Sequence, residues 1–282
     1  MTTDSQRQTP VRPLAVVVGA GGMAMVVARK LGHTYRVLLA DRDAAHLDRQ
    51  VQAMCAEGYD AHGLPCDVTD PDAVARLANA AARSGPLRCL THVVGLSPSM
   101  GDPATILRVD LLGALLVADA FVELAKPGTA AVFVSSVAAH LSSLPSALID
   151  AIDEPLDDNF IDCVQRAAAG ELTSALAYQL SKFGLIRACQ RRAPSWGRRG
   201  ARILSLSPGL IASPQGARES ATQPARSGLV DLTPLKREGT LEEIAEVVDF
   251  LVSDRGSFIT GTDVLVDGGL TAAVAHSLPD TR

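Results

Sequence analysis

Tyr178 and Lys182 lie four positions apart within residues 173–192, a segment with helical spacing. Residues i and i+4 share one face of a helix, so the phenol and the ammonium point into the same space. A free phenol has a pKa of about 10, and a fixed ammonium nearby favours its phenolate form. The pair is therefore suited to moving a proton to or from a carbonyl or alcohol oxygen. An accidental pair on a solvated helix face is the alternative interpretation.

The composition of the chain excludes several classes of protein. Its 282 residues carry a formal net charge of −5, and no basic stretch resembles a nucleic-acid footprint. The first residues lack the apolar core of a signal peptide, and the longest apolar stretch, 111–125, is too short to span a bilayer. Five scattered cysteines without a Cys-x-x-Cys pair favour a reducing compartment over disulfides or a zinc site. We expect a cytoplasmic protein with no nucleic-acid, membrane or metal partner.

Short apolar runs alternate with segments of helical spacing along most of the chain. Within each run the residues do not alternate between apolar and polar, which is typical of strands that are covered on both faces. This order predicts an α/β fold, a single doubly wound Rossmann-type parallel sheet of about seven strands with helices on both faces. The runs cover residues 14–18, 36–40, 64–68, 90–94, 130–134, 202–206 and 264–266, and the helical segments cover 23–31, 44–57, 72–83, 105–124, 173–192 and 241–252.

The predicted domain covers residues 13–273, between a flexible N-terminal tail (1–12) and a C-terminal tail (274–282). Two segments interrupt its rhythm. Residues 141–172 form an insertion with a helical run near 160–169, and residues 213–239 are rich in Pro, Gly, Ser and Arg. We expect the second segment to be a mobile loop near the substrate, because long loops at the carboxyl end of a parallel sheet usually enclose ligands.

A glycine-rich turn, residues 18–24, joins the first strand to the first helix. Gly19, Gly21 and Ala24 fit the dinucleotide fingerprint, in which alanine is permitted at the last place. Such a turn lets backbone amides approach a pyrophosphate at the helix N-terminus. A tight strand–helix turn without a ligand gives a similar pattern.

Asp41 ends the second predicted strand, 20 residues after Gly21. This is close to the spacing of an acid that binds the adenosine ribose hydroxyls, and its charge repels a 2′-phosphate. We therefore expect NAD rather than NADP, although Arg42 beside it could accept that phosphate. The alternative is a helix N-cap, a role open to Asp41 or Asp43.

These residues resemble the short-chain dehydrogenase/reductase family over about residues 13–272. The resemblance implies an NAD-binding enzyme that interconverts a small-molecule alcohol and ketone. It is carried by the glycine turn, Cys66-Asp67-Val68-Thr69, Gly95, Val134-Ser135-Ser136, Tyr178-x-x-x-Lys182, Ser207-Pro208-Gly209, Thr260-Gly261 and Val266-Asp267-Gly268-Gly269.

The resemblance also implies a role for each matching position. Ser136 would hydrogen-bond the substrate oxygen, Tyr178 would transfer the proton, and Lys182 would bind the nicotinamide ribose and tune the phenol. Ser136 could otherwise merely end a strand. The implied cofactor-binding set is Gly19, Gly21, Gly22, Met23 and Ala24 at the pyrophosphate, Asp41 and Arg42 at the ribose, Asp67 and Val68 at the adenine, Gly95, Tyr178 and Lys182, with Pro208, Gly209, Ile211 and Ser213 along the nicotinamide.

Three departures from the family pattern concern the surroundings of this centre. The glycine turn is one residue short, or, without a gap, places Met23 and Met25 on glycine positions. The usual Asn-Asn-Ala-Gly reads His92-Val93-Val94-Gly95, and we expect His92 to be a packed strand residue. Asp110 replaces the asparagine that completes the proton relay. Asp can serve there if only the backbone carbonyl holds the relay water, but not if an amide donor is required.

The long segment between Ser136 and Tyr178 resembles the bacterial 3α-hydroxysteroid dehydrogenase/carbonyl reductase branch. That resemblance implies a bulky or steroid-like ketone as substrate. It also implies a homodimer, because a helical insertion there would obstruct the helices that pair across subunits in tetrameric members. Two alternatives remain: a non-catalytic dinucleotide sensor or scaffold, and a non-redox enzyme on the same scaffold.

Overall fold

The computed structural model describes residues 12–141, 143–153, 159–169, 172–213 and 225–277. Its centre is a seven-stranded parallel sheet in the order β3-β2-β1-β4-β5-β6-β7, which confirms the predicted doubly wound fold. The strands are β1 (Leu14–Val18), β2 (Arg36–Asp41), β3 (Ala61–Pro65), β4 (Leu87–His92), β5 (Ala130–Val134), β6 (Arg202–Pro208) and β7 (Asp263–Val266).

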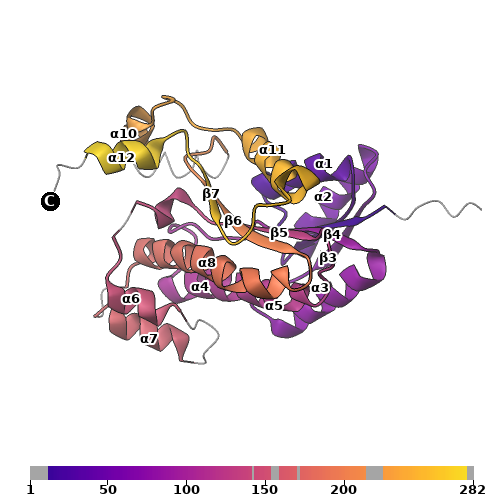
Figure 1. Ribbon diagram of the computed structural model, residues 1–282, viewed down its shortest axis with the longest axis horizontal. Helices are drawn as coiled ribbons and strands as arrows, with labels where there is room; N and C mark the ends of the chain where they lie inside the picture. The colour runs from indigo at the N-terminus through magenta and orange to yellow at the C-terminus, as the bar shows by residue number, and fades with distance from the viewer. Residues whose placement is uncertain (1–11, 142, 154–158, 170–171, 214–224, 278–282) are drawn as a thin grey trace, which may run out of the picture.

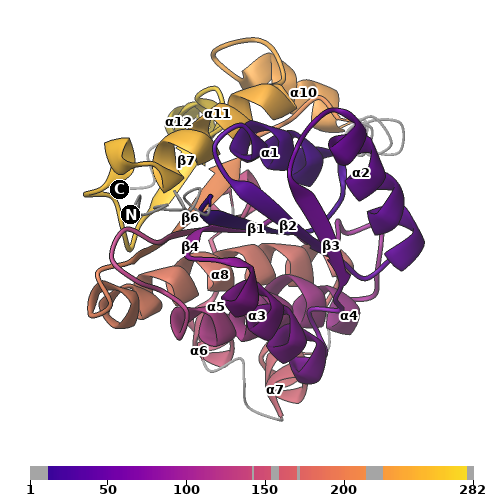
Figure 2. The ribbon, with the colours of Figure 1, turned by 90° about the vertical axis from the view of Figure 1, so that its right-hand side faces the viewer.

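Helices cover both faces of the sheet in two layers (Figure 2). One layer holds α1 (Gly22–Gly32), α2 (Ala44–Ala56) and α11 (Leu241–Val252), and the other holds α3 (Pro71–Ser84), α5 (Ala114–Val122) and α8 (Ser174–Gly197). All five residues of β1 and of β5 are buried because both faces of these strands are covered. The two resulting apolar clusters meet across the sheet.

Side-chain caps begin several of these helices. Asp70 accepts the amide of Asp72 at 2.9 Å, one residue before Pro71 opens α3. Thr240 and Glu243 form a reciprocal capping box at the start of α11. These local signals explain why the predicted and observed bounds of α11 agree.

Three predicted elements were wrong in position or continuity. The strand expected at 64–68 is β3, Ala61–Pro65, an edge strand whose exposed middle residues lack the apolar run that was sought. The strand expected at 90–94 is β4, Leu87–His92. The helix expected at 105–124 is divided into α4 (Pro103–Leu107), the π-helical η1 (Arg108–Gly113) and α5.

The segment expected to be a loop at 213–239 contains a helix, α10 (Ala225–Leu232). Residues 214–224 of that segment lie outside the described residues. The predicted C-terminal tail begins too early, because α12 covers Leu270–Ser277. The predicted N-terminal tail also lies outside the described residues, except for Arg12.

The insertion forms two short helices, α6 (Ser146–Ala151) and α7 (Phe160–Ala167), beside the outer face of α8 (Figure 1). Leu148, Ile152 and Phe160 are buried in the same apolar cluster as α8. Arg187 of α8 donates two hydrogen bonds to Asp153, at 2.8 and 2.6 Å. The insertion is thus a packed layer over α8.

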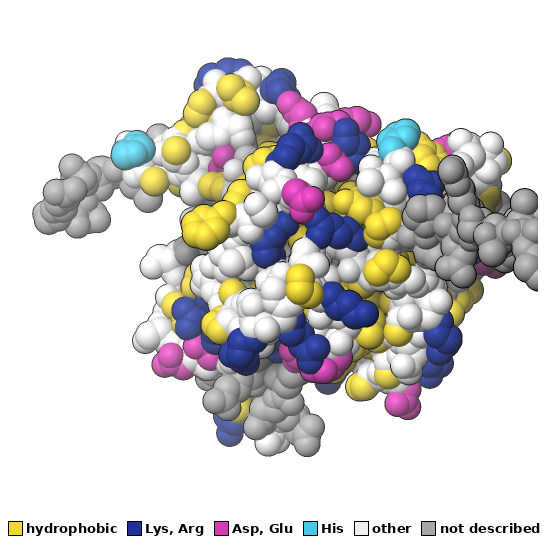
Figure 3. Space-filling view, turned by 45° about the vertical axis from the view of Figure 1, so that its right-hand side comes forward, with side chains coloured by type: hydrophobic (Ala, Val, Ile, Leu, Met, Phe, Trp, Pro, Cys, Tyr) yellow, Lys and Arg dark blue, Asp and Glu magenta, His cyan; other side chains and the backbone are white. Residues whose placement is uncertain are grey.

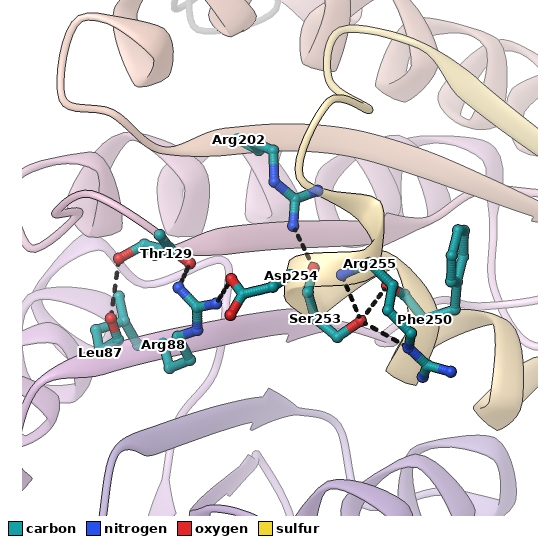
Figure 4. Close-up of polar contacts among 9 residues, drawn as sticks. Leu87, Arg88, Thr129, Arg202, Phe250, Ser253, Asp254 and Arg255 are labelled. Atoms are coloured by element: carbon teal, nitrogen blue, oxygen red, sulfur yellow. Dashed lines mark hydrogen bonds and ion pairs between the residues drawn. The ribbon is translucent and has the colours of Figure 1, made fainter.

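The amino end of the sheet is closed by two arginines (Figure 4). Arg88 of β4 donates to the Gly128 carbonyl and to Asp254. Arg202 of β6 donates to the backbone carbonyls of Ser253 and Ile259, at 3.2 and 3.0 Å. These contacts join the strand ends to the segment after α11. Within the described part of the chain, no helix has the length and apolarity needed to cross a membrane.

Candidate active site

The glycine turn between β1 and α1 leaves space at the carboxyl end of the sheet. Gly19 has a φ of +114°, a conformation that favours glycine. A Cβ on Gly21 would meet no atom within 4 Å. Gly21 is the N-cap of α1, and no side chain caps this helix. The turn therefore has room beside a helix N-terminus, which is what an anionic pyrophosphate needs.

The peptide of Ala20 in this turn is held from both sides. Its amide donates to Oδ2 of Asp41 at 2.8 Å, and its carbonyl accepts from Nε2 of His46 at 2.9 Å. The N-cap of α2 is Asp43, which accepts the amide of His46 at 2.9 Å. The N-cap alternative thus applies to Asp43, and the strand-end Asp41 fixes the glycine turn.

A cavity of about 410 Å³ extends along this turn. Asp67 accepts both the amide and the hydroxyl of Thr69, at 2.9 and 2.7 Å, which fixes its carboxylate at the cavity wall. The open turn and the polar wall fit a bound dinucleotide. The predicted residues that line the cavity are Gly19, Gly21, Gly22, Met23, Ala24, Asp41, Arg42, Asp67, Val68 and Gly95.

A second cavity, of about 170 Å³, lies at the carboxyl ends of β4, β5 and β6. Met23, Val93, Gly95 and Leu96 line both cavities, so the two are adjoining parts of one groove. The structure brings the remaining predicted residues, except Asp110, together here. They are Ser136, Tyr178, Lys182, Pro208, Gly209, Ile211 and Ser213.

The end of β5 and the helix α8 position the three reactive side chains. Ser136 follows β5, and its Oγ accepts the amide of Ala138 at 3.2 Å. Ser135 Oγ donates to the carbonyl of Lys182 at 2.9 Å, which binds the strand end to the helix. The Nζ atom of Lys182 lies 5.5 Å from the ring centroid of Tyr178. Serine, phenol and ammonium therefore share one cavity wall.

Asp110 contacts Lys182 directly. Its Oδ2 lies 3.2 Å from Nζ of Lys182, and its Oδ1 accepts the amide of Leu96 at 2.7 Å. Burial raises the pKa of Asp110, and the attraction of Lys182 opposes this rise without cancelling it. Burial alone would lower the pKa of Lys182, but Asp110 and Tyr178 together outweigh it and the net shift is upward. Lys182 is therefore held as an ammonium.

His92 is fully buried at the end of β4 and stacks on Phe133, with ring centroids 5.4 Å apart. Burial lowers its pKa to about 3, and the charge of Lys182 acts in the same direction. His92 is therefore a neutral, packed residue. Neither of its ring nitrogens has a hydrogen-bond partner among the described residues.

The sequence did not reveal the residues whose hydrogen bonds support the site residues. Ser135 was visible as the first serine of the Val134-Ser135-Ser136 motif, but nothing marked it as the partner of α8. His46 lies one turn into the helix after Asp41, a position that gave no signal of its own. The amide of Leu96 has no side-chain signature. In the described ranges, no cluster of three or more His, Cys, Asp or Glu residues could hold a metal ion.

The chain matches known proteins over nearly its whole length. The family model described as Enoyl-(Acyl carrier protein) reductase matches residues 18–149 and 163–271, leaving out part of the insertion. The chain is 33% identical over 267 residues to Short-chain dehydrogenase/reductase bsc3 of Alternaria brassicicola, covering 93% of this chain and 96% of that one. It is 30% identical over 236 residues to 3-alpha-hydroxysteroid dehydrogenase/carbonyl reductase of Comamonas testosteroni, covering 78% and 90%.

The solved structure of an actinorhodin polyketide ketoreductase with NADPH has a TM-score of 0.73 to this chain, at 20% identity, covering 92% and 97%. That likeness concerns the fold. Fold, site and relatives together define an oxidoreductase of alcohol and ketone groups, from a class that uses nicotinamide dinucleotides. The chain belongs to the short-chain dehydrogenase/reductase family.

Proposed function

We propose that this protein is an NAD(H)-dependent oxidoreductase that interconverts a secondary alcohol and a ketone, with Tyr178 as its general acid and base. The observation that carries this proposal is the convergence of Ser136, Tyr178 and Lys182 on one cavity. That cavity adjoins the space beside the glycine turn.

Each reactive side chain has one task in this proposal. During reduction the Tyr178 hydroxyl donates a proton to the substrate oxygen, and during oxidation its phenolate takes the proton back. Ser136 Oγ already accepts the Ala138 amide, so its own hydrogen can be donated to the substrate oxygen. The Lys182 ammonium, 5.5 Å from the phenol ring centroid, stabilises the phenolate. When bound, the nicotinamide supplies the hydride for reduction and accepts it in oxidation.

Replacing Tyr178 with Phe tests the mechanism. The ring still packs, but no group remains to move the proton, so turnover of a ketone panel with NADH should fall by about 10³-fold or more. Binding of NADH, followed by its fluorescence, should remain within a few-fold of wild type. Turnover at the wild-type rate in this variant would remove Tyr178 from the mechanism.

The carboxylate of Asp41 supports NAD as the cofactor, because it lines the first cavity where it would repel a 2′-phosphate. The Asp41 carboxylate accepts the amides of Ala20 and Asp43, at 2.8 and 3.0 Å; in Asp41→Asn the charge is lost and the side-chain oxygen can still accept one of the two. The ratio of kcat/KM for NADPH to that for NADH should rise at least about tenfold, equivalent to about 1.4 kcal/mol. Arg42→Gln is the matched control and should move the ratio the other way. An unchanged ratio in Asp41→Asn would contradict this role.

We propose that the substrate is a bulky, partly apolar ketone, steroid-like in size and shape. Leu96, Met100 and Ile211 support an apolar surface along the groove. The Comamonas relative is, by its name, a hydroxysteroid dehydrogenase and carbonyl reductase. A panel of a short aliphatic ketone, a substituted cyclohexanone and a 3-ketosteroid tests this, with the highest kcat/KM expected for the larger rings.

We also propose that the protein is a homodimer located in the cytoplasm. All five cysteines are free, which supports a reducing compartment. The insertion covers the outer face of α8, which supports a subunit contact elsewhere.

A further inference from the structure

We propose that Asp110 is a positioning residue whose carboxylate offsets the charge of the Lys182 ammonium by direct contact, so that Tyr178 releases its proton at a higher pH than it would with an uncharged residue at position 110. This inference deepens the proposed function, since it assigns a second control on the same proton donor.

The geometry of Asp110 is that of a fixed counter-ion. Its side chain is 0% exposed. Oδ1 accepts the Leu96 amide at 2.7 Å, and Oδ2, which accepts no hydrogen bond from the described residues, lies in ion-pair contact with the Lys182 ammonium at 3.2 Å. The hydrogen bond from the Leu96 amide orients the Asp110 carboxylate toward α8. An asparagine could keep the bond to Leu96 but would place no charge against Lys182.

Lys182 is equally constrained. Its side chain is 5% exposed, and Nζ also donates to the Val134 carbonyl at 3.4 Å. Gly95 lies directly over the pair, since a Cβ there would come 2.8 Å from Nζ of Lys182 and 3.3 Å from Oδ2 of Asp110. The ion pair is therefore enclosed.

The groups packed around the ion pair of Asp110 and Lys182 contribute little charge of their own. On β4, His92 is neutral because burial lowers its pKa to about 3. On α8, Tyr178 is the titratable neighbour, and β5 contributes the uncharged Ser135 and Ser136. Arg108, on the same π-helical turn as Asp110, is exposed to solvent. With Asp110 ionised, the phenol thus faces one ammonium whose field is partly cancelled by one carboxylate.

Titration of the cofactor-free protein tests the inference directly. Phenolate absorbance is followed against pH for wild type and Asp110→Asn, each paired with its Tyr178→Phe derivative so that the difference reports Tyr178 alone. The two other tyrosines cancel in this difference; one of them, Tyr35, has a pKa raised to about 12 by burial. The midpoint of the Tyr178 step should fall by roughly one pH unit in Asp110→Asn, because a buried charge is removed nearby. An unchanged or higher midpoint in the folded variant overturns the proposal.

The pH profile of alcohol oxidation is the second readout. Its acid limb should move down by the same interval, giving roughly tenfold faster oxidation on that limb at a fixed pH. Asp119→Asn is the matched control, because Asp119 pairs with another cation of α8, Arg192, at 2.7 Å. That control should leave both the titration and the profile unchanged.

A measurement on the wild type keeps the proposal testable if Asp110→Asn does not fold. With nitrogen-15 lysine, four side-chain signals are possible, and the one lost in Lys182→Met should be a protonated, slowly exchanging ammonium at neutral pH. A neutral amine at that position overturns the proposal. These spectra need no turnover, so failure of the proposed redox function would appear separately, as a protein that titrates as expected but does not oxidise NADH.

Discussion

Gly95 packs directly against the ion pair of Asp110 and Lys182, and this contact leaves no room for a side chain. The ion pair of Asp110 and Lys182 approaches its Cα so closely that a methyl group would collide with Nζ. Of the family's Asn-Asn-Ala-Gly motif, only this glycine is present. Its retention follows from a steric requirement at the ion pair.

Gly95→Ala should therefore impair activity more than stability. The added methyl group must displace Nζ of Lys182, and kcat should fall by roughly a hundredfold because the lysine leaves its position beside the phenol. The free energy of unfolding should decrease by about 1–3 kcal/mol, typical of overpacking. Gly197→Ala is the control, since a Cβ there meets no atom within 4 Å. Steady-state kinetics and urea unfolding measure both effects, and full activity in Gly95→Ala would contradict the argument.

Spacing along the chain could predict part of the site. Tyr178 and Lys182 share a helix face by periodicity alone, and Ser136 follows from a strand that ends in serine. The contact between Asp110 and Lys182 could not be predicted, because it depends on how η1 is oriented against α8. The support of Ala20 by His46 was likewise hidden, since it joins a backbone carbonyl to a residue on another element.

At the scale of elements, the carboxylate of Asp153 joins the insertion to α8 in addition to the apolar packing of Leu148, Ile152 and Phe160. Asp153 accepts two hydrogen bonds from Arg187 and one from Arg191, all between 2.6 and 2.8 Å. The pKa of Asp153 is lowered, chiefly by its hydrogen bond with Arg187. Since the folded-state pKa is the lower one, this contact stabilises the fold above the ordinary carboxyl pKa and is lost as pH falls through the folded value.

Asp153→Asn should lower the free energy of unfolding by about 1 kcal/mol at pH 7, because the arginines are partly exposed. The difference from wild type should begin to shrink below about pH 4, where the carboxyl of the unfolded wild type takes up a proton, and should vanish below the lower pKa of the folded state. Urea unfolding at several pH values measures it, with Asp162→Asn on α7 as the control. A difference that stays constant down to pH 2 would show that the charge of Asp153 does not hold the insertion.

The elements themselves were predictable where both faces of a strand or one face of a helix carry a clear pattern. β1, β5 and α11 follow this rule. The region 105–124 does not, because the same apolar spacing continues through α4, η1 and α5. A π-helical turn changes the hydrogen-bond register without changing the residue types, and such turns occur often at functional sites.

At the scale of the whole molecule, β7 forms one edge of the sheet, and exposed apolar side chains occur on it and on the chain that precedes it. Phe250, Phe258 and Leu265 are 37%, 102% and 38% exposed. Figure 3 shows hydrophobic side chains among Lys and Arg side chains over one face of the molecule. Exposed apolar groups at a sheet edge favour pairing with a second copy.

If the proposed dimer forms through this edge, the double variant Phe258→Asp/Leu265→Asp should be a monomer at concentrations where the wild type has the mass of a dimer. At such a contact the two introduced carboxylates would be buried opposite the same carboxylates of the second copy, which opposes dimerisation. Light scattering gives the mass of each, and near-unchanged circular dichroism shows that the fold persists. A stable wild-type tetramer, or a variant that still dimerises, would contradict this surface.

The fold class was the most predictable property, because alternating strands and helices in a parallel sheet admit few topologies. The contacts of Arg88 and Arg202 at the amino end of the sheet also affect the order in which the sheet can be completed during synthesis. Arg88 lies 166 residues before Asp254, and Arg202 needs carbonyls from the same late segment. During translation, β4 is therefore made 166 residues before Asp254, and β6 precedes its partners in the same segment by 51 and 57 residues. We therefore expect the amino end of the sheet to stay open until synthesis is nearly complete, so a chain truncated before Asp254 should be a target for chaperones and proteases.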